Sequence, residues 1–186
     1  MPYLQTEYRR YYYYFKEEYV PSHYRNATAE QRAVQEAVWR FKEGEYTEED
    51  MEWFAIKVRW RYYKFNQQIV TFMPCTTMER HIKRWSRLAD YLEKHTPNNV
   101  ILYGVAHHGW DLTPKHMTGK SGKAWMKAVA DYQEINYKGV VLIDDVLNTG
   151  ESFRITANAL IKASAPNVSG LFYAKTVKPD LPEKDS

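Results

Sequence analysis

Four apolar runs, separated by helical stretches, restrict the fold of this chain more than any other feature of its sequence. The apolar runs lie at residues 69–73, 100–105, 140–143 and 168–177, and helical patterns lie at residues 77–92 and 152–163. Strands that alternate with helices are typical of a mainly parallel sheet whose faces are covered. We therefore expect an α/β fold, in which a mainly parallel sheet has flanking helices.

The composition changes near Asn66, and the chain before this point predicts helices. Thr28 and Gln31 have the spacing of a capping box at the start of residues 29–42, and Thr47 is placed to cap a second helix. These patterns predict a helical N-terminal hood that is rich in aromatic residues. The expected regions are the hood at residues 1–66, an α/β core at residues 67–178 and a tail at residues 179–186.

The composition excludes several classes of protein. The chain has 186 residues, a net charge of +3 and one cysteine, Cys75, so it has no disulfide framework or cysteine-based zinc site and fits a reducing compartment. No segment approaches the roughly 18 apolar residues of a membrane helix, and the N-terminus lacks the apolar stretch of a signal peptide. We expect a soluble, cytoplasmic protein without a membrane partner. The charge does not demand nucleic acid, although it suits an anionic substrate.

The most informative segment, residues 140–152, reads VVLIDDVLNTGES. Four apolar residues predict a buried strand, and Asp144 and Asp145 follow at its carboxyl end, where open α/β sheets bind ligands. The chain then enters a helix, and we expect the backbone amides of residues 148–152 at its start to form a phosphate site. Carboxylates and amides together suit a sugar phosphate, because the carboxylates accept hydrogen bonds from ribose hydroxyls. The alternative is an ordinary turn in which Asp145 helps to cap the helix.

This segment resembles the phosphoribosyl pyrophosphate (PRPP) binding motif of type I phosphoribosyltransferases, which has four hydrophobic residues, two acidic residues and a loop ending in Thr-Gly. The resemblance covers residues 69–177. It implies that Asp144 and Asp145 contact the ribose diol. It also implies that the following loop binds the 5′-phosphate through Asn148, Thr149, Gly150, Glu151 and Ser152.

The same resemblance gives roles to two further segments. The loop after the first core strand would bind pyrophosphate, through Cys75, Thr76, Thr77 and Arg80, and Arg84 follows on the same helix. A long basic loop would close over PRPP, and its lysines are Lys115, Lys120 and Lys123. Arg80 and Lys120 are the expected catalytic groups, since they would stabilise charge on the leaving pyrophosphate. The order of these parts resembles the ComF-like, competence-associated branch of the family.

The resemblance implies an enzyme that transfers the 5-phosphoribosyl group from PRPP to a nucleobase-like acceptor and releases pyrophosphate. Mg²⁺ would be the cofactor, held chiefly by substrate oxygens, with Asp144 and Asp145 as additional contacts. Asn148 stands where members that take hypoxanthine or guanine carry an aspartate, and an amide cannot act as a base. The acceptor is therefore left open. The alternative function is a non-catalytic module that binds PRPP or a nucleotide and acts in regulation or with nucleic acid.

Two other patterns are open to more than one interpretation. Residues 119–121 read Gly-Lys-Ser, as at the end of a nucleotide-binding P-loop, but Pro114 replaces the earlier glycine that this loop needs. Residues 11–15 are four tyrosines and a phenylalanine that would stack on exposed bases. We expect instead that they pack on the domain or mediate self-association, for example in a homodimer.

Overall fold

The computed structural model describes most of the chain, namely residues 2–5, 10–24, 27–62, 68–96, 100–101, 106–108, 128–130, 135 and 137–178. The predicted basic loop, with Lys115, Lys120 and Lys123, lies outside the described residues, as does the tail at residues 179–186. None of the helices within the described ranges is long and apolar enough to cross a membrane.

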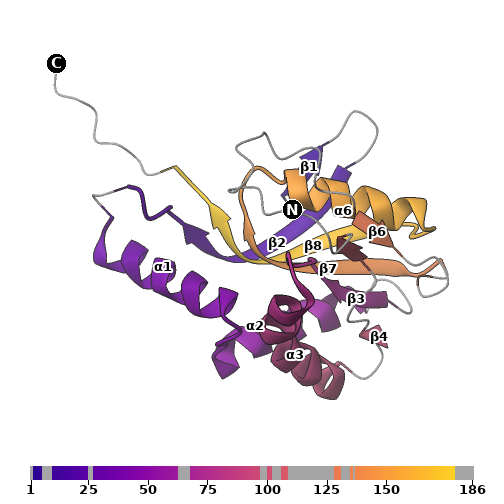
Figure 1. Cartoon of the computed structure of the whole chain (residues 1–186), viewed down its shortest axis with the longest axis horizontal. Helices are drawn as coiled ribbons and strands as arrows, with labels where there is room; N and C mark the ends of the chain where they lie inside the picture. The colour runs from indigo at the N-terminus through magenta and orange to yellow at the C-terminus, as the bar shows by residue number, and fades with distance from the viewer. Residues whose placement is uncertain are drawn as a thin grey trace.

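A six-stranded sheet with the order β1-β2-β8-β7-β3-β4 forms the centre of the molecule (Figure 1). Its strands are β1 (Tyr3–Gln5), β2 (Arg10–Tyr19), β3 (Gln68–Phe72), β4 (Val100–Ile101), β7 (Gly139–Leu147) and β8 (Val168–Thr176). Each neighbouring pair from β2 to β4 is parallel, and β1 pairs with β2 in the antiparallel direction. The prediction of a mainly parallel sheet is confirmed.

Helices cover both faces of this sheet (Figure 1). On one face lie α1 (Ala29–Lys42), α2 (Glu48–Tyr62) and α3 (Met78–His95), and on the other lies α6 (Glu151–Lys162). A separate two-stranded sheet, made of β5 (Ala106–His108) and β6 (Ala128–Ala130), lies beside α6. The α/β class with flanking helices is therefore confirmed.

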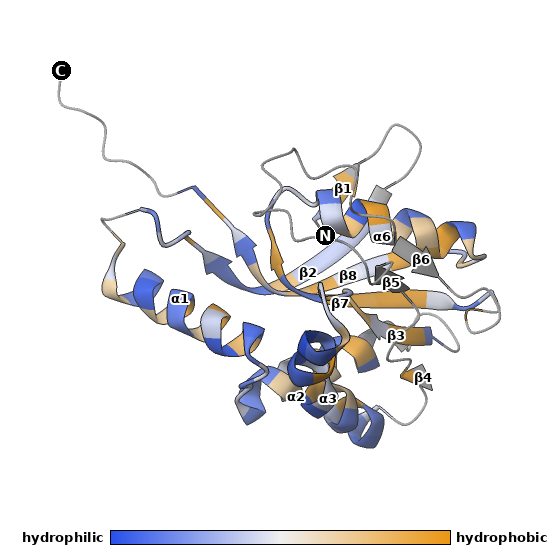
Figure 2. Ribbon diagram, in the orientation of Figure 1, coloured by the Kyte–Doolittle hydropathy of each residue, from blue (hydrophilic) through white to orange (hydrophobic). Residues whose placement is uncertain are grey.

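Each face of the sheet has its own hydrophobic core. Phe41, Phe72 and Trp85 belong to the cluster beneath α1, α2 and α3, and Phe153 and Phe172 belong to the cluster beneath α6. The central strands are hydrophobic along most of their length, whereas the helices carry polar residues on their outer sides (Figure 2). A strand that is buried on both faces needs such a continuous apolar run. This is why the apolar runs identified the core strands.

The predicted helix starts are present. The Thr28 side chain accepts from the Gln31 amide at 3.2 Å, and the Gln31 side chain accepts from the Thr28 amide at 2.9 Å, which completes the capping box of α1. Thr77 caps α3 by accepting from the Arg80 amide at 3.2 Å. These contacts satisfy amides that have no partner within the helix.

The described residues among the first twenty differ from the prediction of a helical hood, because β1 and β2 are strands. Tyr11 and Tyr13 are buried, whereas Tyr12 is 41% exposed, so β2 alternates like a strand with one tyrosine-lined inner face. Parallel pairing with β8 satisfies the backbone of β2, and the Tyr11 hydroxyl donates to Asn158 at 2.6 Å. The expectation that this tyrosine cluster packs on the domain is confirmed for Tyr11 and Tyr13. The boundary between residues 66 and 67 stays a prediction.

Candidate functional site

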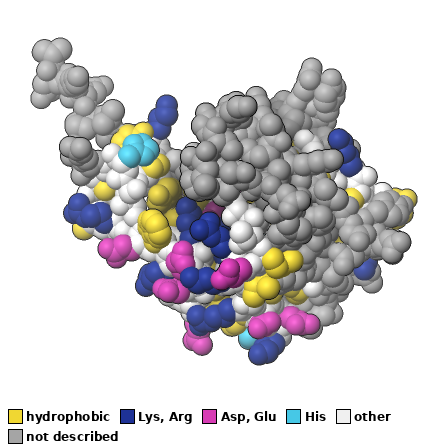
Figure 3. Space-filling model, viewed as in Figure 1, with side chains coloured by type: hydrophobic (Ala, Val, Ile, Leu, Met, Phe, Trp, Pro, Cys, Tyr) yellow, Lys and Arg dark blue, Asp and Glu magenta, His cyan; other side chains and the backbone are white. Residues whose placement is uncertain are grey.

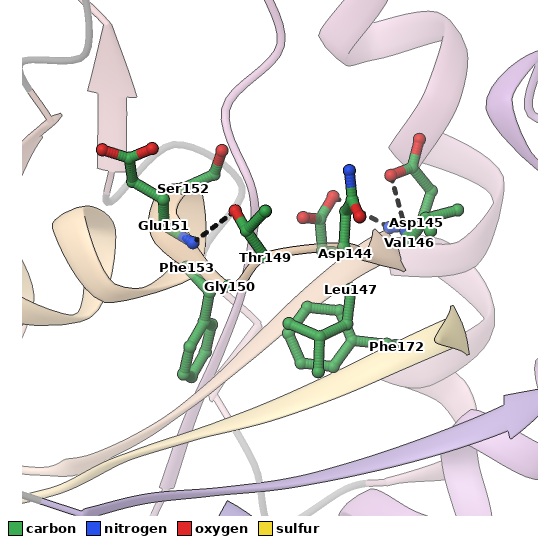
Figure 4. A pocket seen from close by; sticks show the side chains of 11 residues that line it. Asp144, Asp145, Val146, Leu147, Thr149, Gly150, Glu151, Ser152, Phe153 and Phe172 are labelled. Atoms are coloured by element: carbon green, nitrogen blue, oxygen red, sulfur yellow. Dashed lines mark hydrogen bonds between the residues drawn. The ribbon is translucent and has the colours of Figure 1, made fainter. Parts of the chain in front are cut away.

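A pocket of about 230 Å³ opens where β7 passes into α6 (Figure 4). It is lined by residues 144–153 and by Phe172 of the neighbouring strand β8. Every residue that the resemblance assigns to the ribose and to the 5′-phosphate lies in this lining. The pocket is smaller than the ~300–1,000 Å³ that is common for larger ligands, so its size suits a small polar group or one part of a larger ligand.

The turn into α6 leaves the start of that helix without a side-chain cap. Gly150 is the N-cap residue, and its φ of 75° lies in the left-handed region that favours glycine. The Glu151 amide donates to the Thr149 hydroxyl over a long 3.4 Å, and the Arg154 amide makes the first helical bond to the Gly150 carbonyl at 2.9 Å. This helix start therefore lacks a side-chain cap from its N-cap residue, and the positive end of the helix dipole favours an anion at this position.

The two aspartates do not point in the same direction. Figure 4 shows the Asp144 carboxylate on the side of Thr149 and the Asp145 carboxylate on the opposite side. Each one also accepts from the next backbone amide, Asp144 from Asp145 at 2.8 Å and Asp145 from Val146 at 2.6 Å. The backbone therefore fixes both side chains, but only Asp144 faces the turn that precedes α6.

An irregularity in β7 accompanies this arrangement. Ile143 and Val146 both pack in the cluster beneath α1, α2 and α3, whereas Leu142 and Leu147 both pack in the cluster beneath α6. Strict alternation would place residues 143 and 146 on opposite faces. The alternation of burial therefore shifts by one residue at the acidic pair, although the pairing of β7 with β8 keeps the same register before and after it.

Burial changes the acidity of Asp144. Its side chain is removed from water, and the negative charge of Asp145 lies beside it, so the pKa of Asp144 is well above the ordinary value for a carboxyl group. A carboxyl group with a raised pKa binds a proton more readily and can then donate as well as accept a hydrogen bond. Asp144 is thus suited to contact a hydroxyl group.

Arg84, on α3, forms an ion pair with Asp145 on the side away from the turn. Its Nη1 lies 3.0 Å from Oδ2 of Asp145, and its Nε donates to the Lys42 carbonyl at 3.1 Å. The sequence placed Arg84 on this helix but gave the pyrophosphate role to Arg80, which is exposed in the first turn of α3 and does not line the pocket. The sequence signal that could have identified Arg84 was its position on the helix, since it lies next to buried Trp85 and four residues before buried Leu88.

The loop at residues 74–77 lies next to the acidic pair. The Met73 amide donates to the Ile143 carbonyl at 2.7 Å, which holds the end of β3 against β7. Burial raises the pKa of the Cys75 thiol to about 11, so this thiol is protonated at neutral pH and is no nucleophile. Because Cys75 is buried and the Thr77 hydroxyl caps α3, a ligand at this loop would chiefly meet backbone amides and Thr76.

Two residues near the site were not predicted from the sequence. Phe172 lines the pocket from β8. Leu4 of β1 packs against the turn, since a Cβ atom added at Gly150 would lie 2.6 Å from Leu4 Cδ1. Both come from strands that are distant in sequence from residues 144–153, so no local pattern indicates them.

The acidic pair does not by itself fit a resident Mg²⁺ ion. The Asp145 carboxylate is already paired with Arg84, and the raised pKa of Asp144 opposes the ionised form that a metal needs. Across the ranges that the structure describes, no three His, Cys, Asp or Glu side chains converge as a metal site. A magnesium ion at this pocket would have to depend on ligand oxygens and water.

Fold and site together define an α/β protein with an acidic pair and an uncapped helix start at the carboxyl end of a parallel strand. Its sequence matches no protein-family model and no curated protein. Among solved structures, the chain is similar to a hypoxanthine phosphoribosyltransferase from Staphylococcus aureus, with 14% identity over 83% of each chain and a TM-score of 0.43. It is also similar to a purine phosphoribosyltransferase from Pyrococcus horikoshii Ot3, with 16% identity over 92% of this chain and 99% of that chain and a TM-score of 0.36. Likenesses at these values assign no activity to this chain, so its function rests on the residues of the site.

Proposed function

We propose that this protein binds the ribose 5-phosphate part of PRPP where β7 meets α6, and that it transfers this group to a nitrogenous base with release of pyrophosphate. The observation that carries the proposal is that one pocket contains both Asp144 and the uncapped turn at Gly150. A sugar phosphate has hydroxyl groups that can bind Asp144 and an anionic phosphate that can bind the turn at Gly150. An ordinary turn between a strand and a helix needs neither a buried carboxyl group nor an unfilled cap.

The binding step follows from hydrogen-bonding capacity. The first-turn amides of α6 donate to phosphate oxygens, and the positive end of the helix dipole favours their charge. Asp144 and Asp145 each accept one backbone amide, and Asp145 also accepts from Arg84. Because a carboxylate offers about four acceptor positions, both side chains retain capacity for a ribose hydroxyl.

The transfer step depends on stabilising the leaving pyrophosphate. The loop at residues 74–77 is adjacent to the acidic pair, and Arg80 follows it on α3. Positive groups placed at this end of the sheet would stabilise the charge that accumulates as the bond to pyrophosphate breaks. In this proposal Arg80 and Lys120 supply that charge, and Mg²⁺, which would be held by oxygens of the substrate, would add positive charge beside the leaving group.

Calorimetric titration tests the binding step. Ribose 5-phosphate and PRPP, each with and without Mg²⁺, are titrated into the wild-type protein and into Asp144→Asn. We expect wild-type binding of both ligands, a gain with Mg²⁺ for PRPP alone, and a loss of at least about tenfold in the variant, as expected for one lost charged hydrogen bond. Asp90→Asn, on the exposed side of α3, is the control. Absence of wild-type binding would refute the proposal.

Turnover is tested separately. Pyrophosphate release is measured with PRPP, Mg²⁺ and a panel of purine and pyrimidine bases. Release that depends on one class of base supports transfer and identifies the acceptor. Binding without release from any base supports the second candidate, a non-catalytic PRPP- or nucleotide-binding module. The position of Arg80 favours this candidate, because this expected catalytic group is exposed and does not line the pocket. Assignment to the ComF-like branch is part of the same proposal.

A nucleic-acid partner remains the less favoured proposal. Tyr11 and Tyr13 are buried, so only part of the tyrosine cluster is available to stack on bases. Among the described side chains, basic and acidic groups are interspersed on the face seen in Figure 3. Such mixing lacks the basic stripe that follows a phosphate backbone. A homodimer is compatible with this surface and would be tested by light scattering.

A further inference from the structure

Arg84 connects three elements around the acidic pair. It belongs to α3, it donates to the carbonyl of Lys42 at the end of α1, and it is paired with Asp145 on β7. The two charged side chains are only 21% and 14% exposed, so water screens their interaction less than it screens a surface ion pair. This contact is therefore a fixed part of the site rather than one of many surface ion pairs.

The contact also determines the orientation of Asp145. Its Oδ2 accepts from Arg84 at 3.0 Å, and its Oδ1 accepts from the Val146 amide at 2.6 Å. A carboxylate that is held through both oxygens cannot rotate without breaking one of these bonds. Each oxygen nevertheless keeps a free lone pair. Asp145 is thus a pre-oriented acceptor with a fixed charge partner behind it.

We propose that Arg84 is the positioning residue of the ribose site, which acts on the sugar by holding Asp145 in place and does not contact the phosphate. This inference rests on the proposed function. The Asp145 carboxylate points away from the turn at Gly150 (Figure 4), and it is this carboxylate that accepts from Arg84, so the phosphate half of the site is built without the pair. Arg84 therefore governs how well the protein distinguishes a sugar phosphate from phosphate alone.

The chain supplies a matched control on the same helix. Arg87 lies one turn further along α3 and donates to the Tyr46 carbonyl at 3.0 Å, as Arg84 does to the carbonyl of Lys42. Arg87 thus repeats the link between α3 and the N-terminal helices without an ion pair to the acidic residues. Arg87→Gln measures the loss of such a link alone.

The experiment compares two ligands, ribose 5-phosphate and inorganic phosphate, by calorimetry on the full chain. We expect Arg84→Gln to lower the affinity for ribose 5-phosphate on the order of tenfold and to change the affinity for inorganic phosphate by no more than about twofold. Arg84→Lys should recover part of the loss, since it restores the charge but not the two-point guanidinium geometry. Arg87→Gln should bind both ligands like the wild type.

A double-mutant cycle guards against a purely structural effect of the substitution. Asp145→Asn should reproduce the sugar-selective loss, and Arg84→Gln combined with Asp145→Asn should be no weaker than either single variant, because both remove the same interaction. Equal weakening of both ligands, unchanged ribose 5-phosphate binding in Arg84→Gln, or additive losses in the cycle would overturn the role of Arg84. A wild type that binds neither ligand would overturn the proposed function itself.

Discussion

Asp144 is a carboxyl group that the fold holds out of water at the end of a strand. This position affects both the stability of the folded protein and the binding of a ligand by Asp144. Burial and the neighbouring charge of Asp145 raise its pKa. The folded protein therefore binds a proton at this group more tightly than the unfolded chain does. Above the folded pKa the ionised form reduces the stability of the fold, and this loss disappears as the pH falls toward the unfolded pKa of about 3.9.

Asp144→Asn should accordingly make the ligand-free protein more stable at pH 7, by on the order of 1 kcal/mol for each unit of pKa shift removed. The amide oxygen can still accept from the Asp145 amide, so the local backbone keeps its bond. The free energy of unfolding in urea is compared at pH 7 and pH 5. The advantage of the variant should shrink at the lower pH, and an equal advantage at both values would contradict the pKa argument.

Gly150 is constrained twice. Its left-handed φ disfavours any residue with a Cβ, and that atom would also collide with Leu4. Gly150→Ala should therefore lower the free energy of unfolding by about 1–2 kcal/mol for the backbone alone, with a further loss from the contact. Combining Gly150→Ala with Leu4→Ala should recover only the part of the lost unfolding free energy that comes from the collision with Leu4. Urea titrations of the two single variants and the double variant check this, and simple additivity would exclude the collision.

At the scale of elements, α3 supplies Arg84 and begins at Thr77, whose hydroxyl caps its first turn. Thr77→Ala should cost about 1 kcal/mol, and Thr77→Ser should cost much less, because serine also caps well. Thermal unfolding of both variants measures the difference. Equal losses would show that the hydroxyl is not the stabilising group.

The sequence predicted the elements whose physical signal is local. Strands β3, β7 and β8 are buried on both faces and therefore appear as continuous apolar runs, and α3 and α6 show the helical spacing of buried residues. Strand β2 was missed because tyrosine occupies both its inner and its outer face, as Tyr11 and Tyr12 show. An alternation of burial without an alternation of residue type is invisible in a sequence.

Some parts of the candidate site could also be predicted from local sequence, and others could not. Asp144 and the turn at Gly150 were predictable, since one continuous segment supplies both the strand end and the helix start. The partner of Asp145 was not, because Arg84 lies 61 residues away and its choice of carboxylate depends on how α3 packs against β7. Contacts of this kind follow from the assembled sheet and not from spacing along the chain.

At the scale of the whole molecule, the N-terminal residues are part of the same core as the rest. Residues of α1 and α2, such as Phe41 and Phe54, share one cluster with Trp85 and with strand residues of the central sheet. Strand β2 lies between β1 and β8 and not at the periphery. These contacts make independent folding of residues 67–178 unfavourable. The predicted boundary at the start of this region was based only on a change in amino-acid composition.

Expression of residues 67–178 alone tests this point. We expect a chain without a cooperative unfolding transition, because the fragment exposes the β2 edge of β8 and one side of the core around Trp85. The full chain should instead unfold in one transition, with the same midpoint by circular dichroism and by tryptophan fluorescence. A fragment that melts cooperatively would establish residues 67–178 as a domain of their own.

The pairing of β2 with β8 has a consequence for how the protein is made. Strand β2 is synthesised well before β8 and must wait for it, because Tyr13 pairs with Gly170, which lies far along the sequence. Until then, a tyrosine-rich edge has no neighbour to satisfy its backbone. Such distant pairing slows folding and prolongs exposure to aggregation. Nascent chains should therefore depend on chaperones during translation more than the mature protein does once its sheet is complete.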